Sequence, residues 1–300
     1  MRITNNLAST AAANGLAALR EQIAATQRQI TSGKRFETPS QDPVASQQAL
    51  RNDRESRALA QYRRTIAAAR SRTDLEDNAL QNLTNLLTRA REIAIQQGDD
   101  SANATSRQQA VTEVNGLLSE AVALATVRDG EEYVFGGQQS TTPPYTITEG
   151  TIFTFSTTGG GPVGTRAVEI GAGETMVPVH DGVSVFGTTS GGVLKTLQDL
   201  ATALNTGDRA QVTSQLSGLT AAQVGLQQQV ADTGARGSRL DIADANLSAF
   251  ATQLSARTSA LRDVDMEAAT TELVTRQTTY QAAMAATSRV LTMSLTDYLK

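Results

Sequence analysis

The sequence predicts a mainly α-helical fold: a long antiparallel helical rod with terminal coiled-coil helices and a small β domain inserted at its far tip. Proline is absent from residues 44–142 and from residues 179–300, so long helices can run through both stretches. Most of the 23 glycines and four of the six prolines lie between Gly130 and Gly192. The chain is therefore expected to be helical, then divided by turns, and then helical again.

Composition excludes several classes of protein. Aromatic residues make up only 4% of the chain, so Ala and Leu must fill the contacts that aromatic side chains fill in most globular cores. The net charge of −4 argues against a general affinity for nucleic acid, and no run of 18 apolar residues is present that could cross a membrane. The absence of cysteine excludes disulfides and cysteine-ligated metals. Because the N-terminal stretch has no apolar core, we expect no cleaved secretory signal.

The first predicted helix has a narrow apolar stripe. Leu16, Leu19, Ile23 and Ile30 follow steps of three and four residues, with Thr26 in the gap. A Ser-Gly pair after this pattern predicts the end of the helix, because glycine tolerates the left-handed conformation found there.

A sharp break follows in the stretch ETPSQDPVAS, residues 37–46. Asp42 can cap a new helix by accepting a hydrogen bond from a free backbone N–H. Pro43 suits the first helical position, because an N–H there would have no partner. Pro39 disfavours helix at the residue before it and is expected to hold the linker extended. We interpret Pro39, Asp42 and Pro43 as a hinge between the terminal helix and the rod.

Two further helices are predicted before the middle of the chain. The first runs over residues 44–97 and would be about 80 Å long at the usual helical rise. One apolar register follows its length, and Thr73 and Glu76 weaken the middle of that register. The next helix is predicted over roughly residues 106–127.

The middle of the chain changes period. Five short runs rich in β-branched and aromatic residues, separated by turn residues, predict a small β domain of about 50 residues. The runs are EEYVFGG, TPPYTITEG, TIFTFSTT, RAVEIG and TMVPV.

Helices resume near Val193 in the second half of the chain. The long helix after it is expected to be broken or irregular near Gly234 to Gly237. Asp263 or Asp265 is expected to cap the last helix.

The simplest way to bury the apolar stripes of both halves is to pair the N-terminal half with the C-terminal half as an antiparallel bundle. This pairing predicts a terminal coiled-coil assembly region of residues 1–42 and 263–300. It also predicts a helical rod domain of residues 43–137 and 190–262 and an inserted β domain of residues 138–189.

No motif supports catalysis, a cofactor or a metal. His180 is the only histidine, and we interpret it as a surface loop residue with Asp181 beside it in a turn. The G-x-G-x-x-G match at residues 159–164 contains a proline and precedes a predicted strand, so a loop explains it better than phosphate binding. In residues 187–196 the lysine stands too late for a phosphate loop, and the stretch DVDME lacks the later ligands of a calcium loop. The arginines near residues 63–72, followed closely by acids, favour a solvated face with salt bridges.

The narrow apolar stripes of the first and last predicted helices are the most unusual feature of the sequence. A helix pair this slender buries little area and is expected to be marginal alone. It is either an ordinary coiled-coil tail or a segment that becomes ordered when several subunits pack together, and we favour the second interpretation. The predicted assembly interface comprises Leu7, Leu16, Leu19, Ile23, Ile30, Leu273, Tyr280, Met284, Leu291, Leu295, Tyr298 and Leu299.

Long collinear motifs at both ends resemble a known family. MRITNNLA and ITSGKRFETPSQDPVAS resemble the N-terminal region of the bacterial flagellin superfamily. ADTGARGSRLDIADANL and LRDVDMEAATTELVTRQTTYQAAMAATSRVLTMSLTDYL resemble its C-terminal region. The prolines in PSQDPVAS, together with EYVFGGQQSTTPPY and VEIGAGETMVPVHDGVSVFG, are similar to the hook–filament junction members of that superfamily.

The resemblance implies a structural role at the hook–filament junction of the flagellum, outside the cell. It implies export in an unfolded state through the flagellar type III channel, with an export chaperone that guards the C-terminal helix. It also implies self-association in a ring or helical layer, contact with the first hook-associated junction protein, and a surface on which flagellin polymerises. Neither nucleic acid nor membrane insertion is expected.

Three alternatives remain open at this point. The chain could be a short flagellin that forms the filament itself. It could be an enzyme with its site in the β block around His180. It could be an unrelated coiled-coil scaffold, although the terminal motifs argue against that.

Overall fold

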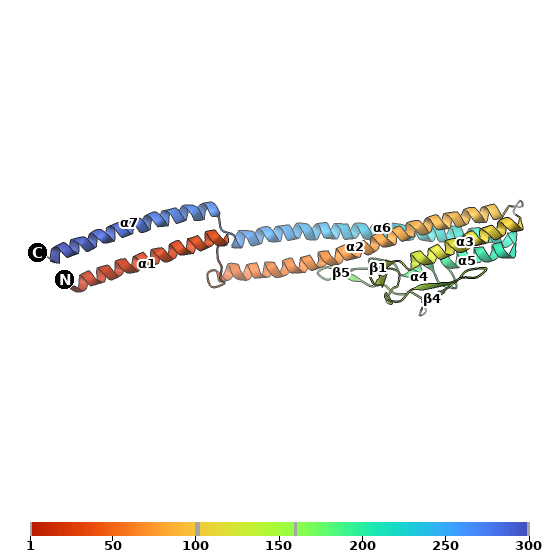
Figure 1. The fold of residues 1–300 in the computed structure, drawn as a ribbon, viewed down its shortest axis with the longest axis horizontal. Helices are drawn as coiled ribbons and strands as arrows, with labels where there is room; N and C mark the ends of the chain where they lie inside the picture. Colours follow the sequence, from red (N-terminus) through yellow and green to blue (C-terminus); the bar gives the residue numbers. More distant parts are fainter. Residues whose placement is uncertain (1, 100–102, 159–160, 299–300) are drawn as a thin grey trace. The chain divides into compact units, whose positions relative to one another are not determined.

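The computed structural model describes the backbone of residues 2–99, 103–158 and 161–298, and the side chains of residues 10–99, 103–158 and 161–289. Contacts divide the chain into two compact units, residues 1–58 with 249–300 and residues 59–248. The element order is shown in Figure 1. The elements are α1 (Arg2–Ser32), α2 (Pro43–Gln97), α3 (Ala104–Ala125), β1 (Arg128–Asp129), β2 (Glu132–Tyr133), β3 (Tyr145–Thr148), β4 (Thr154–Thr157), β5 (Val168–Gly171), β6 (Glu174–Met176), α4 (Gly182–Phe186), α5 (Val193–Thr206), α6 (Arg209–Arg262) and α7 (Met266–Tyr298).

The predicted fold class is confirmed: long helices frame a middle section of short antiparallel strands. The predicted helix starts at Pro43 and Val193 are confirmed as well. Proline and glycine positions were sufficient to place these boundaries, because both residues act on the backbone whatever packs around it.

Within residues 59–248, α2 and α6 run antiparallel. Arg63 pairs with Asp244 at 2.8 Å, and farther along α2 the Thr88 hydroxyl accepts a hydrogen bond from Gln223 at 3.3 Å. At the end of this pair, Arg209 at the start of α6 donates to the carbonyl of Gly98 after α2. α3 and α5 pack against each other and share one core with α2 and α6.

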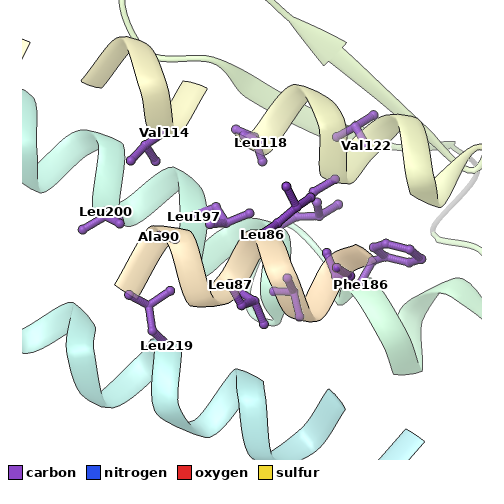
Figure 2. Packing of buried hydrophobic residues seen from close by; sticks show 14 of the residues in the cluster. Leu86, Leu87, Ala90, Val114, Leu118, Val122, Phe186, Leu197, Leu200 and Leu219 are labelled. Carbon is purple, nitrogen blue, oxygen red and sulfur yellow. The ribbon is translucent and has the colours of Figure 1, made fainter. Parts of the chain in front are cut away.

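This core is made almost wholly of aliphatic side chains. Leu86 and Leu87 of α2 face Leu118 of α3, Leu197 of α5 and Leu219 of α6 (Figure 2). Helical spacing of leucines along four helices allows each to fill the gap between the others, so most of these side chains are completely buried. Four helices can therefore form a fully buried core without many aromatic residues.

The strands form three separate two-stranded antiparallel hairpins instead of one sheet. Ile170 of β5 and Met176 of β6 pack against Ile66 and Ala69 of α2 and Leu240 of α6. The expected position at the far tip is therefore wrong for this hairpin, which lies along the sides of the helices. Strands of two to four residues bury too little against one another, so each hairpin uses the helices as its core.

The few aromatic residues gather where the hairpins meet α4. The rings of Phe135 and Phe186 meet edge to face at 4.9 Å, and Tyr145 lies 5.9 Å from Phe186. The Tyr145 hydroxyl lies 2.8 Å from the carbonyl oxygen of Gly182 and 2.7 Å from that of Gly187. Burial raises the pKa of Tyr145, so the hydroxyl keeps its proton and remains a donor.

The expected break near Gly234 to Gly237 is wrong, because α6 is continuous from Arg209 to Arg262. Gly237 has a packing role instead: a Cβ atom there would lie 2.2 Å from Nη1 of Arg70 on α2. Arg70 uses this space to reach Asp241 at 3.2 Å. A glycine inside a helix weakens it by about 1 kcal/mol, which tertiary contacts of this kind can offset.

Among the described residues, each helix is too short or too polar to serve as a membrane-spanning segment.

Candidate functional site

The candidate assembly region comprises α1, α7 and the two linkers that connect them to α2 and α6. The linkers lie side by side in antiparallel orientation, with Lys34 opposite Asp263. The N–H of Arg35 donates to the carbonyl of Arg262 at 2.6 Å, and the N–H of Val264 donates to that of Gly33 at 3.0 Å. The two breaks in the helices are therefore joined by backbone hydrogen bonds.

The predicted hinge residues form a compact corner. Asp42 accepts from the N–H of Ala45 at 3.0 Å, which confirms it as the cap of α2, and its other oxygen pairs with Arg35. Pro39 is the second residue of a turn closed by the N–H of Gln41 and the carbonyl of Thr38. The expectation of an extended linker at Pro39 is therefore wrong: proline fits this turn position because its φ angle is already fixed.

The linker to α7 has its own cap. Asp265 accepts hydrogen bonds from the N–H groups of Glu267 at 3.0 Å and Ala268 at 3.1 Å. This contact confirms the predicted cap of the last helix at Asp265.

The α1–α7 pair buries very little. The predicted stripe residues of α1, and two of the predicted residues of α7, are only half-buried. These residues are Leu16, Leu19, Ile23, Ile30, Leu273 and Tyr280. Within residues 10–32 and 266–289, only Thr26 and Ala269 are buried, and one of these is polar. The guanidinium of Arg20 lies over the Tyr280 ring at 5.4 Å, and Arg276, earlier on α7, reaches Thr26, later on α1, so the two helices run antiparallel.

One predicted interface residue, Met284, is exposed, and two further apolar side chains of α7 are exposed as well. Met284 is 47% exposed, and so is Met266, while Val274 is 62% exposed. At the helical repeat, Met266 and Met284 lie on the same side of α7 as Leu273 and Tyr280, whereas Val274 lies farther round the helix. α7 therefore presents apolar side chains that α1 leaves uncovered. The predicted residues Leu7, Leu291, Leu295, Tyr298 and Leu299 lie outside the residues whose side chains the structure describes.

His180 is not a surface loop residue, and that interpretation is wrong. Its side chain is 9% exposed. Its Nδ1 lies 2.7 Å from Oε1 of Glu76 on α2, and its Nε2 lies 2.8 Å from Oδ2 of Asp232 on α6. The backbone N–H of His180 also donates to Glu76. The segment before α4 is thus fastened to two helices at once.

The partners of His180 belong to a wider polar contact. Arg236 pairs with Asp232 at 2.7 Å, and its other nitrogen donates to the carbonyl of Val177. Thr73 of α2 donates to the carbonyl of Pro178 at 3.1 Å. Thr73 and Glu76 are the two residues that interrupt the apolar register of α2, so the sequence contained a signal for this contact.

Asp181, expected in a turn, caps the short helix α4 by accepting from the N–H of Ser184 at 2.9 Å. Its second oxygen accepts from the N–H of Gly164 at 3.2 Å. Of the glycine pattern at residues 159–164, Gly159 lies outside the described residues, and Gly161 and Gly164 adopt positive φ angles in an irregular segment. Among the described residues 161–181, no helix begins that could bind a phosphate.

A second ionic contact ties β2 to α2. Glu132 pairs with Arg166 at 3.0 Å and with Arg72 at 2.8 Å. The guanidinium of Arg166 first, and that of Arg72 next, lower the pKa of Glu132. The carboxylate therefore stabilises the fold above the usual pKa of glutamate, and this contribution is lost as the pH falls through the lowered value.

The described residues offer little for catalysis. A cavity of about 220 Å³ lies beside His180, lined by Ala69, Arg72, Val168 and Pro178 among others. Both ring nitrogens of His180 are already engaged by carboxylates. Among the described residues, no group of three or more His, Cys, Asp or Glu side chains is placed to hold a metal ion.

Comparisons with known proteins agree with the motifs at both ends. Residues 3–140 match the bacterial flagellin N-terminal helical region, and residues 210–299 match the bacterial flagellin C-terminal helical region. The chain is 27% identical over 161 residues to flagellar hook-associated protein 3 of Salmonella typhimurium, across 53% of this chain and 48% of that protein. The chain thus matches about half the length of this curated relative.

Solved structures show the same fold at low identity. FlgL from Xanthomonas campestris has a TM-score of 0.60 at 17% identity, covering 69% of this chain and 99% of that one. The flagellar junction protein FlgL from Legionella pneumophila has a TM-score of 0.57 at 17% identity, covering 72% of this chain and 100% of that one.

Replacing His180 with alanine tests the buried contact. The substitution leaves the wholly buried Glu76 without its ring partner, so we expect a loss of about 3–5 kcal/mol in the free energy of unfolding. The double variant H180A/E76L should recover much of that loss, since it removes the orphaned charge. Denaturant titration of the full chain measures both.

The matched control is Arg239→Ala, which removes the exposed ion pair with Glu174 and should cost less than about 1 kcal/mol. A His180→Ala variant as stable as this control would show that the buried contact does not fasten the segment.

Proposed function

Because the chain belongs to the bacterial flagellin family, we propose that it is a structural subunit of the flagellum, placed at the hook–filament junction and completed by its neighbours. Its terminal helices form the assembly interface. The segment of residues 59–248 folds independently and gives each subunit its rigid part.

The weak burial of the α1–α7 pair carries this proposal. In residues 59–248, leucines such as Leu80, Leu83 and Leu87 are fully buried, whereas the aliphatic stripe of α1 is only half-buried. Two helices joined by so few buried side chains are marginal in water. Association with other subunits would cover the remaining apolar surface and stabilise the ordered state by mass action.

The exposed side chains Met266, Val274 and Met284 support the same conclusion. A subunit in a polymer needs one apolar face for its own partner helix and another for its neighbours. α7 offers apolar surface for both, since Leu273 and Tyr280 are half-buried in the pair with α1 and these three side chains stay exposed.

The partners proposed here follow from the family. The chain would contact the first hook-associated junction protein on one side and flagellin on the other, and it would contact its own copies within a layer. It would leave the cell unfolded through the flagellar type III channel, with an export chaperone bound to α7 beforehand. The chain would have no catalytic activity, in keeping with His180, whose two ring nitrogens both lie against carboxylates in a contact between helices.

A short flagellin is the second candidate, because the matched family regions are named for flagellin. Polymerisation distinguishes the two. Purified chain is added to sheared flagellar filaments as seeds, and cells lacking the gene for this chain are tested for filaments and swimming.

A junction subunit should leave the seeds unextended, and the deletion cells should carry hooks without filaments until the gene is restored. Seeds that elongate into long filaments of this chain would favour the flagellin alternative. Normal filaments on the deletion cells would contradict the junction role.

The corner at Pro39, Asp42 and Pro43 is proposed as the hinge that lets one kind of subunit fit two differently curved neighbours. Replacing Pro39 and Pro43 together with alanine removes the fixed φ angles and allows helix to extend through the turn. We expect weaker junction assembly to lower the fraction of swimming cells, scored in a soft-agar assay, by at least about tenfold.

The stability of residues 59–248 should be unchanged in this variant, as measured by denaturant unfolding. Thr38→Ala, in the same turn but with both prolines kept, serves as the control. Normal motility of the double proline variant would count against the hinge.

A further inference from the structure

The aliphatic stripe of α1 cannot by itself determine how α1 and α7 align. Leu16, Ile23 and Ile30 are spaced at intervals of seven residues, and so are Leu273 and Tyr280 on α7. If one helix slides past the other by seven residues, aliphatic side chains again face apolar side chains. Contacts of this kind therefore stabilise several alignments nearly equally.

One polar contact breaks this repeat. Thr26 donates from Oγ1 to the carbonyl of Gln22 at 3.1 Å and accepts from Nη1 of Arg276 at 3.0 Å. The same Nη1 lies 2.9 Å from the Gln22 carbonyl oxygen, and Nη2 is held by Glu272 one turn earlier on α7. The Arg276 guanidinium is thus oriented on its own helix and reaches across to two acceptors on the other.

The burial of these groups makes the contact selective. Thr26 is 1% exposed, and it is the most buried side chain among the described residues of the α1–α7 pair. The Arg276 side chain is 29% exposed, so its guanidinium is partly removed from water. A buried hydroxyl and a partly buried cation each lose free energy when their partner is taken away.

A slipped alignment takes these partners away. Seven residues from Thr26 stand Leu19 on α1 and Gly33 just after its end, and seven residues from Arg276 on α7 stand Ala269 and Ala283. In one slipped alignment the guanidinium faces Leu19, in the other it lies at the end of α1, and in both the hydroxyl of Thr26 faces an alanine. The aliphatic contacts tolerate the slip, whereas the polar contact does not.

We propose that Thr26 and Arg276 form a register lock, a buried polar pair that selects one alignment of α1 with α7. The alignment determines which side chains of α7 remain uncovered for neighbouring copies. This consequence for assembly rests on the proposed function, whereas the lock itself is a property of the single chain.

Cross-linking of the purified full-length chain tests the lock. The chain has no cysteine, so pairs can be introduced without background. Arg20→Cys with Tyr280→Cys reports the observed alignment, since those side chains are in contact. Arg20→Cys with Leu273→Cys or Thr287→Cys reports slips of seven residues in either direction. A short bismaleimide traps even transient pairing, and the intramolecular product is identified by its faster migration in a denaturing gel.

The unsubstituted background should favour the 20–280 product over the slipped products by about tenfold, the value expected for hydrogen bonds to a charged group. In a T26V/R276L background this preference should fall at least about threefold, while helix content measured by circular dichroism is unchanged. Thr31→Val is the matched control, because Thr31 makes the same hydrogen bond within α1 but is exposed and should keep the preference.

An unsubstituted chain that shows no preference, or a T26V/R276L chain that keeps it, would overturn the lock. These outcomes are independent of the proposed function, because they need no flagellum. If the lock holds and the T26V/R276L protein still supports normal swimming, the link between alignment and assembly fails while the lock stands.

Discussion

The apolar area that each group of helices can cover determines how the rest of this chain is organised. Four helices in residues 59–248 enclose leucines on all sides, and most side chains of their core are fully buried. Two helices at the chain ends cannot enclose anything, so their aliphatic residues stay half-buried. Similar helical sequences thus form a stable core where four helices meet. Where only two helices meet, they form an interface that needs neighbouring subunits to become stable.

Where apolar contacts bury little area or fit several arrangements equally well, buried polar contacts determine which arrangement forms. His180 between Glu76 and Asp232, with Thr73 and Arg236 bonded to the carbonyls before it, holds an irregular segment against two helices. Thr26 with Arg276 distinguishes alignments that leucine and isoleucine cannot. In both places a polar residue interrupts a helical apolar pattern, and its partner comes from a distant part of the chain. Both contacts therefore pair a buried polar residue with a distant partner. One contact holds a segment against two helices, and the other aligns two helices with each other.

The sequence was sufficient to predict the helices and their ends, because proline, glycine and capping residues act locally. Pro43 with Asp42 placed the start of α2, and the prolines and glycines of the middle section identified the region of short strands. The sequence did not reveal why residue 237 is a glycine. The guanidinium of Arg70, on another helix, occupies the space that a side chain would need. The sequence also failed for His180, because its carboxylate partners lie 104 and 52 residues away. The gap at Thr26 was visible in the stripe, but its partner Arg276 depends on an alignment that only the structure supplies.

Hydrogen exchange of the free and the assembled chain tests the central claim that neighbouring subunits complete the terminal helices. In dilute free protein, amides of residues 10–32 and 266–289 should exchange far faster than those of the leucine-rich core within residues 59–248. In isolated hook–filament preparations the same terminal amides should become protected to a level near that of the core. Equal and strong protection of both terminal stretches in the free chain would contradict the account, since the helices would then need no neighbours.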